Sequence, residues 1–217
     1  GDMLAPHARN RLTVVQIRKS TNMEWIEWGI NAGIDHSLLG WCKDNPHLFA
    51  SFEDVKDPDE NPYIFHPKQQ RAAFVTPRSL HSASDILHQR HLFNDKTLTA
   101  ALMGTIGDRG AMDLMAFVKL SDQLPSRDSI KEDPKNAKVP DSAAAVCMVV
   151  YRTLATMETD YINPWMEYMP RLDPEAQGMF ANGVRAAKYS KQPMVMGNKK
   201  FTDWARANSH LFTTDKK

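Results

Sequence analysis

Apolar residues recur at helical spacing along most of this chain, and the segments that carry them begin at residues that cap helices. Asp35, for example, precedes a segment in which Leu38, Leu39 and Cys42 form the packing set, and Pro46 ends that segment. The same reasoning predicts helices at residues 22–31, 36–45, 77–87, 96–106, 111–120, 142–157, 161–169, 174–189 and 202–211. We therefore expect a mainly α fold, built as a multi-helix bundle with a helical C-terminal extension.

One of these helices is apolar on most of its sides. Residues 143–150 form an almost unbroken apolar run, and Asp141 is expected to cap the helix that contains them. A helix without a polar face belongs inside a protein rather than on its surface. The sequence therefore places the helix at residues 142–157 in the centre of the fold.

A single strand is predicted near the N-terminus. Residues 12–17, LTVVQI, are rich in β-branched side chains and read as one short buried strand. A strand without neighbours is not stable in water. We expect it to pair with other material or with another copy of the chain, or else to be loosely ordered.

Two stretches lack a helical period. Residues 51–70 are rich in acids, prolines and aromatic residues and are expected to form a long loop. Residues 192–200, with Pro193 and Gly197 as turn residues, are expected to cross the surface. The acids of the first loop lack the glycine and the closing glutamate of a calcium loop, so a solvated turn is favoured over a metal site. These acids are Asp54, Asp57, Asp59 and Glu60.

Composition narrows the class of protein. The 217 residues are 42% hydrophobic, enough for one large domain or for a domain with an extension. The 27 basic and 26 acidic residues give a net charge of +1, which provides no overall field to attract nucleic acid or a membrane. Cys42 and Cys147 lie in apolar helical contexts, as reduced buried thiols do. No apolar run has the length of a membrane span, so a cytoplasmic protein is expected.

Residues 74–87, FVTPRSLHSASDIL, are the stretch most suggestive of chemistry. Thr76 is expected to cap the helix, Pro77 to occupy its first position and Arg78 its second. An arginine there opposes the helix dipole, so it is not placed for helix stability. A helix N-terminus and a guanidinium both donate hydrogen bonds to phosphate oxygens, which makes Arg78 a candidate phosphate ligand. The alternative is an ion pair with a nearby carboxylate.

Two further groups of residues compete with this candidate. Arg9 and Arg11 precede the predicted strand, where they are free to reach a neighbouring subunit's phosphate or to form a solvated basic turn. His81, His88 and His91 share one face of the central helix and have the residue type of a divalent metal site. No HExxH motif or paired acid frames them, so surface imidazoles are favoured.

Several common catalytic motifs are absent from the sequence. Ser79, Ser82 and Ser84 lack a GxSxG elbow, and neither cysteine lies in a charged context. The chain contains no GxxxxGK[ST] phosphate loop and no GxGxxG fingerprint. The chain by itself therefore has no sequence motif that cradles the phosphates of a nucleotide.

The order of several short motifs resembles the C-terminal part of a MoxR-like AAA+ ATPase of the phage and bacterial type. These motifs are ARNRL before the predicted strand, two tryptophan-bearing helices, FVTPRS opening a helix, and the stretch LMGTIGDRGAMDLMAFVKLSDQLPS. The resemblance covers roughly the first three-fifths of the chain. It implies three parts: the end of the AAA+ core at residues 1–19, a helical lid domain at 20–121 and a helical extension at 122–217.

The resemblance also implies roles for individual residues. Arg11, with Arg9 as second choice, corresponds to the arginine finger that contacts ATP held by the next subunit of a ring. Arg78, preceded by Pro77, corresponds to the sensor 2 residue, which contacts the γ-phosphate of the subunit's own nucleotide. ATP and Mg²⁺ are then the cofactors of the intact protein, and none is expected bound to this chain, which lacks the Walker A and Walker B motifs and is not catalytic alone.

These expectations leave three hypotheses of function. The leading one is a fragment of an AAA+ ring that couples ATP binding and hydrolysis to the remodelling of a client protein. The second is a free-standing helical module that binds a protein without any dependence on nucleotide. The third is a metal-dependent hydrolase that uses the histidine face.

Overall fold

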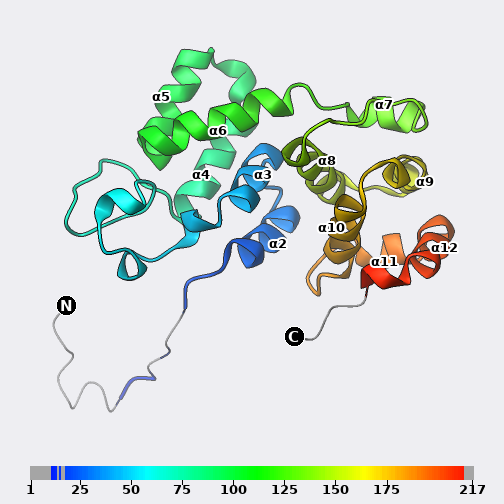
Figure 1. Ribbon diagram of the computed structural model, residues 1–217, viewed down its shortest axis with the longest axis horizontal. Coiled ribbons are helices and arrows are strands. Elements are labelled where there is room, and N and C mark those ends of the chain that lie inside the picture. Colours follow the sequence, from blue (N-terminus) through cyan, green and yellow to red (C-terminus); the bar gives the residue numbers. More distant parts are fainter. Residues whose placement is uncertain (1–10, 14, 16–17, 213–217) are drawn as a thin grey trace.

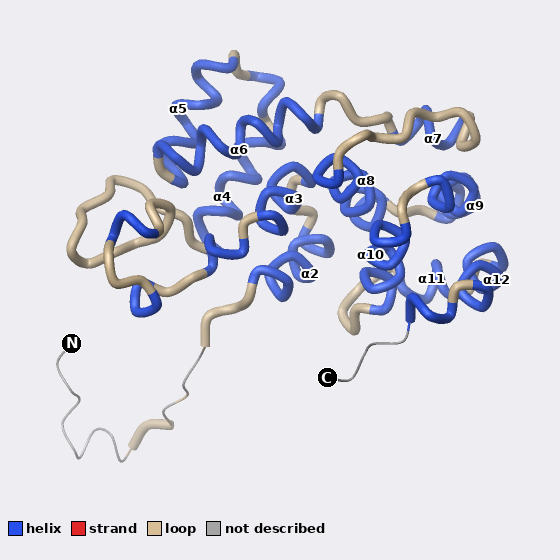
Figure 2. The backbone as a smooth tube through the Cα atoms, in the orientation of Figure 1, coloured by secondary structure: helices blue, strands red, loops and turns tan. Residues whose placement is uncertain are grey.

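The computed structural model describes residues 11–13, 15 and 18–212, and this part of the chain contains α-helices and 3-10 turns but no strand (Figures 1 and 2). The mainly α fold class is thus confirmed. The α-helices are α2 (Asn22–Ala32), α3 (His36–Asp44), α4 (Pro77–His88), α5 (Asp95–Ile106), α6 (Asp108–Ser121), α7 (Arg127–Glu132), α8 (Ala143–Thr156), α9 (Thr159–Tyr168), α10 (Pro174–Arg185), α11 (Gln192–Met196) and α12 (Lys199–Ala207). The 3-10 turns are η1 (Pro46–Phe49), η2 (Phe52–Asp54), η3 (Pro58–Glu60), η4 (Arg90–Leu92), η5 (Met169–Arg171) and η6 (Ser209–Phe212).

Helix α8 lies at the centre of the described part. Its residues from Ala145 to Tyr151 are all buried, which confirms the core position expected for this apolar segment. Helices α2 and α3 pack on it, as does α10. In Figure 1, α4, α5 and α6 extend beyond α3, whereas α9, α11 and α12 lie beyond α10. Buried apolar residues connect these groups into one core, since the same hydrophobic cluster runs from Trp25 to Phe201.

Most of the described α-helices begin where a side chain accepts a hydrogen bond from a free N–H of the first turn, whereas α6, α9 and α11 have no such cap. Thr21 forms a capping box with Glu24, and Asp35 accepts a bond from the Ser37 N–H. Gly33 ends α2 in the left-handed conformation, with φ 74°, as its lack of a side chain permits. The predicted cap at Asp141 is wrong by one residue, because the hydroxyl of Ser142 accepts the bond from the Ala145 N–H at 3.3 Å.

Several helix boundaries differ from those predicted, and those of α6, α10 and α12 (Lys199–Ala207 instead of 202–211) differ by three residues or more. Helix α6 begins at Asp108, three residues before the expected start, because Gly107 makes the tight turn itself with a φ of 83°. Helix α10 ends at Arg185 instead of continuing to residue 189. The predicted surface crossing at 192–200 is wrong: these residues include helix α11, in which Val195 is fully buried. Burial there was not visible from the local sequence because Pro193 and Gly197 suggested turns.

The strand predicted at residues 12–17 is not shown. Among its described residues, Leu12 is 55% exposed and Val15 is 72% exposed, and neither belongs to a strand. Residues 14, 16 and 17 lie outside the described part. The predicted division of the chain at residues 19 and 121 stays a prediction.

The long loop after η1 is held against the helices. The Asn61 side chain donates to the carbonyl of His47 at 2.7 Å, and the Tyr63 hydroxyl donates to the carboxylate of Asp113 on α6. Ile64 is only 2% exposed. The loop therefore packs as part of the fold and leads directly into α4.

Among the described helices, none combines the length and the apolar character that a membrane span requires.

Candidate functional site

The first turn of α4 forms as the sequence predicts. Thr76 and Ser79 make a reciprocal capping box: the Ser79 N–H donates to the Thr76 hydroxyl at 3.0 Å, and the Thr76 N–H donates to the Ser79 hydroxyl at 2.8 Å. Pro77 occupies the first helical position, where the missing N–H has no cost. Arg78 follows on the exposed side of the turn.

The segment before this turn is fixed at several points. The Val75 N–H donates to the Tyr63 carbonyl at 2.7 Å, and Val75 is 1% exposed. The Ser79 hydroxyl donates to the Phe74 carbonyl at 2.9 Å. Gly107, at the turn between α5 and α6, lies so close that a Cβ added to it would stand 2.8 Å from the Ala73 carbonyl oxygen. Arg78 therefore projects from a rigid base.

Arg78 makes no hydrogen bond, ion pair or ring contact with any residue that the structure describes. The carboxylate partner that the sequence left open is not found there. Most other described arginines do have a partner: Arg18 pairs with Glu24, for instance, and Arg90 with Asp122. An exposed guanidinium that pairs with no carboxylate can bind an anion without breaking an existing contact.

Arg11 is also exposed, and within the described residues it makes no polar contact. Arg9, the second choice for the same role, lies outside the described part of the chain. Nothing in the structure brings Arg11 to Arg78, and the roles of both remain predictions. The predicted involvement of Pro77 in the phosphate contact also stays a prediction; in the structure it occupies the first position of α4.

The histidine face is not assembled as one surface. His81 and His88 are exposed on α4, but the helix ends at His88, so the expectation that His91 shares the same helical face is wrong and this residue lies in the turn η4. The ring of His81 instead contacts Trp28 edge-on, with centroids 5.5 Å apart. No group of three potential metal ligands occurs among the described residues, which gives the metal-dependent hydrolase hypothesis no support.

The acidic loop uses two of its carboxylates to shape the chain. Asp54 accepts from the Ser51 N–H at 3.1 Å, and Asp57 accepts from the Asp59 N–H at 3.0 Å. Both bonds cap short 3-10 turns. These acids therefore act as local turn formers.

The serines and cysteines singled out in the sequence also have local environments. Ser84 is buried and its hydroxyl accepts the Asp35 N–H at 2.9 Å, which joins α4 to the start of α3. Burial raises the pKa of the Cys42 thiol, and burial likewise dominates the raised pKa of Cys147. A buried thiol held in its protonated form is a poor nucleophile. Ser82 is exposed, and Ser79 is occupied in the cap described above.

A serine and a histidine that the sequence did not single out lie within hydrogen-bonding distance. His36 Nε2 is 2.6 Å from the Ser121 hydroxyl, between the start of α3 and the end of α6. Burial lowers the pKa of His36, so the imidazole is neutral and the contact is a neutral hydrogen bond. Ser121 is only 7% exposed, which hides it from a substrate. This pair serves to join two helices.

The residue that sequence reasoning missed is Arg109. It occupies the second position of α6, as Arg78 does in α4, and within the described residues it makes no hydrogen bond or ion pair. The signal was the same, an arginine in the first turn of a helix against the dipole. It was overlooked because the helix was expected to begin at Ala111.

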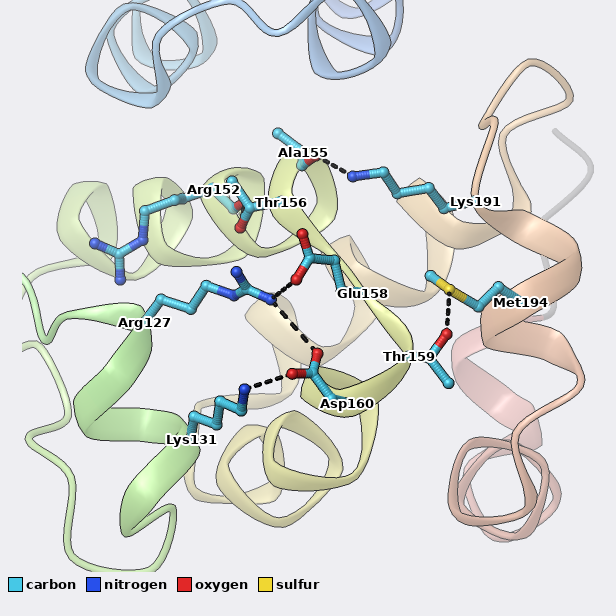
Figure 3. Close-up of polar contacts among 10 residues, drawn as sticks. All are labelled: Arg127, Lys131, Arg152, Ala155, Thr156, Glu158, Thr159, Asp160, Lys191 and Met194. Atoms are coloured by element: carbon cyan, nitrogen blue, oxygen red, sulfur yellow. Dashed lines mark hydrogen bonds and ion pairs between the residues drawn. The ribbon is translucent and has the colours of Figure 1, made fainter.

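In a polar network at α7, the cations are paired with groups of the fold, unlike Arg78 and Arg109 (Figure 3). Arg127 donates to the carboxylate of Glu158 at 2.6 Å and lies 3.8 Å from a carboxylate oxygen of Asp160. Lys131 forms an ion pair with the same Asp160, and Lys191 donates to the Ala155 carbonyl. Figure 3 shows that these side chains come from α7, from the end of α8 and the start of α9, and, for Lys191, from the residue before α11. Each of these three cations has at least one acceptor within the fold, although the Nε of Arg127 is buried without one, so the network serves to join these helices.

Comparison with known proteins adds no assignment: no family model, no curated protein and no solved structure matches this chain.

Proposed function

We propose that this chain is the lid and C-terminal extension of a MoxR-like AAA+ ATPase, in which Arg78 senses the γ-phosphate of ATP. The observation that carries the proposal is the state of Arg78: exposed, without a partner among the described residues, and projecting from a capped helical turn. A side chain in that state loses no internal contact when it binds an anion, and its fixed base lowers the entropy cost of binding. The order of ARNRL and FVTPRS in the sequence supports the same role.

The mechanism follows from electrostatics. Phosphoryl transfer spreads negative charge over the γ-phosphate oxygens, and a guanidinium placed against them stabilises that charge. ATP would draw Arg78 and its helix toward the nucleotide, and hydrolysis would release them. Because α4 packs on α5, and α3 connects α6 to the central α8, such a movement would be transmitted through packed helices to the rest of the chain. Arg11 would serve the nucleotide of the adjacent subunit, and the stroke would remodel a client protein.

This proposal requires an ATP-binding core, because the chain contains no phosphate loop of its own. A first test is to read the coding sequence upstream of the first residue. We expect a GxxxxGK[ST] motif followed by a strand that ends in paired acids. Their absence from that reading frame would contradict the proposal.

The biochemical test is ATP turnover. The chain alone is expected to hydrolyse no ATP, whereas the protein that includes its core is expected to hydrolyse ATP and to lose about a hundredfold or more in kcat on Arg78→Ala. Arg78→Lys keeps the charge without the planar fork and should recover only part of that loss. Arg206→Ala removes an exposed arginine elsewhere and serves as the matched control. Turnover that Arg78→Ala leaves unchanged would refute the role of Arg78.

A nucleotide-independent binding module remains the second candidate, and one observation favours it. A cleft of about 670 Å³ lies beside α2, lined among others by Arg18, Trp28 and Lys188. Trp28 is 46% exposed there, and an exposed tryptophan beside mixed charges is typical of binding surfaces. If this candidate is correct, a partner that copurifies with the chain will be lost on Trp28→Ala and retained on Arg78→Ala, with or without ATP.

A further inference from the structure

A cleft of about 350 Å³ separates the segment before α4 from the beginning of α6. Its lining includes the charged residues Arg71, Asp108 and Arg109 together with the backbone of Ala73 and Gly107. The two arginines come from positions far apart in the sequence and reach one cleft because the α5–α6 turn packs against the chain that enters α4.

The positive charge of this cleft is not neutralised by the fold. Arg71 donates only to neutral oxygens, the carbonyls of Ile64 and Pro58 and the side-chain oxygen of Gln69. Arg109 makes no hydrogen bond or ion pair in the described part of the chain. Two guanidinium groups thus face one lining carboxylate, that of Asp108, which leaves an excess of positive charge.

A second acid of α6 is already engaged in a hydrogen bond. Asp113, one turn beyond Arg109, accepts a hydrogen bond from the Tyr63 hydroxyl. Burial, followed by this bond, raises the pKa of Tyr63 to about 12, and Arg109 acts in the opposite direction. The guanidinium of Arg109 therefore lies within electrostatic range of the Tyr63–Asp113 pair, yet forms no ion pair with it.

The walls of the cleft are fixed before any ligand binds. Arg71 is tied to two carbonyls of the loop, at Ile64 and Pro58. Gly107 approaches the Ala73 carbonyl so closely that no side chain would fit between them. A preformed cleft pays little ordering entropy on binding.

We propose that this cleft is an anion site for a compound with two linked phosphate groups, held by Arg71 and Arg109 and separate from the contact proposed for Arg78. Arg109 is free to bind one phosphate through two parallel N–H bonds, whereas Arg71, whose Nη atoms already donate to neutral oxygens, contributes its charge and its remaining N–H groups to the other phosphate. The volume of the cleft accommodates more than a single phosphate. The site stands independently of the ATPase proposal, because none of its residues was assigned there.

The test uses inorganic pyrophosphate as the probe, titrated calorimetrically into the full chain at low ionic strength. We expect measurable binding below about 1 mM, weakened about tenfold by Arg109→Ala and reduced by Arg71→Lys, which keeps the charge but has fewer N–H donors. Asp108→Asn removes the opposing carboxylate and should tighten binding by about threefold. Arg206→Ala is the matched control for the loss of one exposed arginine.

Each other outcome overturns the site. No heat of binding up to about 10 mM pyrophosphate, or binding unaffected by Arg109→Ala, excludes it. An equal loss in Arg206→Ala indicates non-specific attraction. A loss in Arg78→Ala with Arg109→Ala unaffected would transfer the binding to α4, which favours the ATPase proposal and refutes this one. Circular dichroism of each variant confirms that the fold is retained.

Discussion

Three of the described α-helices carry an arginine in the first turn, and these arginines are of two kinds, paired with carboxylates or unpaired. At α7, Arg127 is surrounded by Glu158 and Asp160 and its guanidinium lies 4.9 Å from the ring centroid of Tyr161. At α4 and α6, Arg78 and Arg109 have no carboxylate partner in the described residues. The local sequence position is nearly the same, so the difference comes from what the fold places opposite each helix.

This contrast separates arginines that hold the fold from arginines available to a ligand. Where α7 meets α9, the cations Arg127 and Lys131 form ion pairs with Glu158 and Asp160. These carboxylates lie about thirty residues further along the chain, at the residue before α9 and in its first turn. At the beginnings of α4 and α6, neither Arg78 nor Arg109 forms an ion pair with a described residue, although Asp108 lies beside Arg109. A guanidinium that the fold does not pair is available to bind an anion.

The largest effect on stability is expected at Gly107, where the start of α6 packs against the segment before α4. Gly107→Ala would place a methyl group 2.8 Å from the Ala73 carbonyl and force a side chain into a φ of 83°. We expect a loss of about 2–3 kcal/mol in the free energy of unfolding, measured by urea denaturation. The matched control is Gly104→Ala on α5, where an added Cβ meets nothing within 4 Å and should stabilise the helix by about 0.5–1 kcal/mol. Similar results at both glycines would contradict the close packing of α6 on the segment before α4.

A smaller loss is expected at the compensated junction. Arg127→Ala leaves the carboxylate of Glu158 without its hydrogen-bond donor and removes the contact with Tyr161. We expect about 1–2 kcal/mol of destabilisation by the same measurement, of which Arg127→Met should recover the part due to packing. A change below about 0.5 kcal/mol would place Arg127 in the same class as Arg78.

The pH dependence of stability probes the contact between α3 and α6. Burial lowers the pKa of His36 below its ordinary value, Arg152 and Arg90 act in the same direction, and Asp35 and Asp122 oppose them. The unfolded chain therefore takes up a proton first as the pH falls below about 6.5, and stability decreases from there toward the folded-state pKa. Denaturation at pH 7.5 and 5.5 should show this decrease in the wild type and a weaker one in His36→Gln, which retains a hydrogen-bonding side chain without titrating in this range. Identical pH profiles would exclude His36 as the cause.

The smallest effects are expected at the two unpaired arginines. Arg78→Ala and Arg109→Ala break no contact in the described structure, and each removes a positive charge from the positive end of a helix dipole. The free energy of unfolding should change by less than about 0.5 kcal/mol in either variant, toward greater stability. A destabilisation comparable to that of Arg127→Ala would show that these arginines serve the fold after all.

Local sequence signals predicted most helices well, but they predicted poorly the features that depend on contacts with distant segments. Thr76 and Pro77 predicted the start of α4 because capping depends only on residues within one turn. The start of α6 was missed because Gly107 adopts a conformation that only its packing against Ala73 makes evident. Helix α11 was missed because the burial of Val195 depends on residues distant in sequence.

For the candidate site too, local sequence predicted single residues but not which residues lie together. The sequence identified Arg78 from its unfavourable place in a helix, and the same rule would have identified Arg109 had the helix boundary been correct. The cleft that joins Arg109 to Arg71 had no signal in the sequence. Thirty-odd residues separate these arginines, and a local pattern carries no information on which distant segments meet.

The sequence by itself determined the mainly α fold, the caps and the apolar centre at α8, because these depend on side-chain period and on bonds within a single turn. Only the tertiary structure decided which arginines are neutralised. The charge opposite a helix start is supplied by another segment, and long-range packing alone brings Glu158 and Asp160 to Arg127 while leaving Arg78 and Arg109 without an ion-pair partner among the described residues.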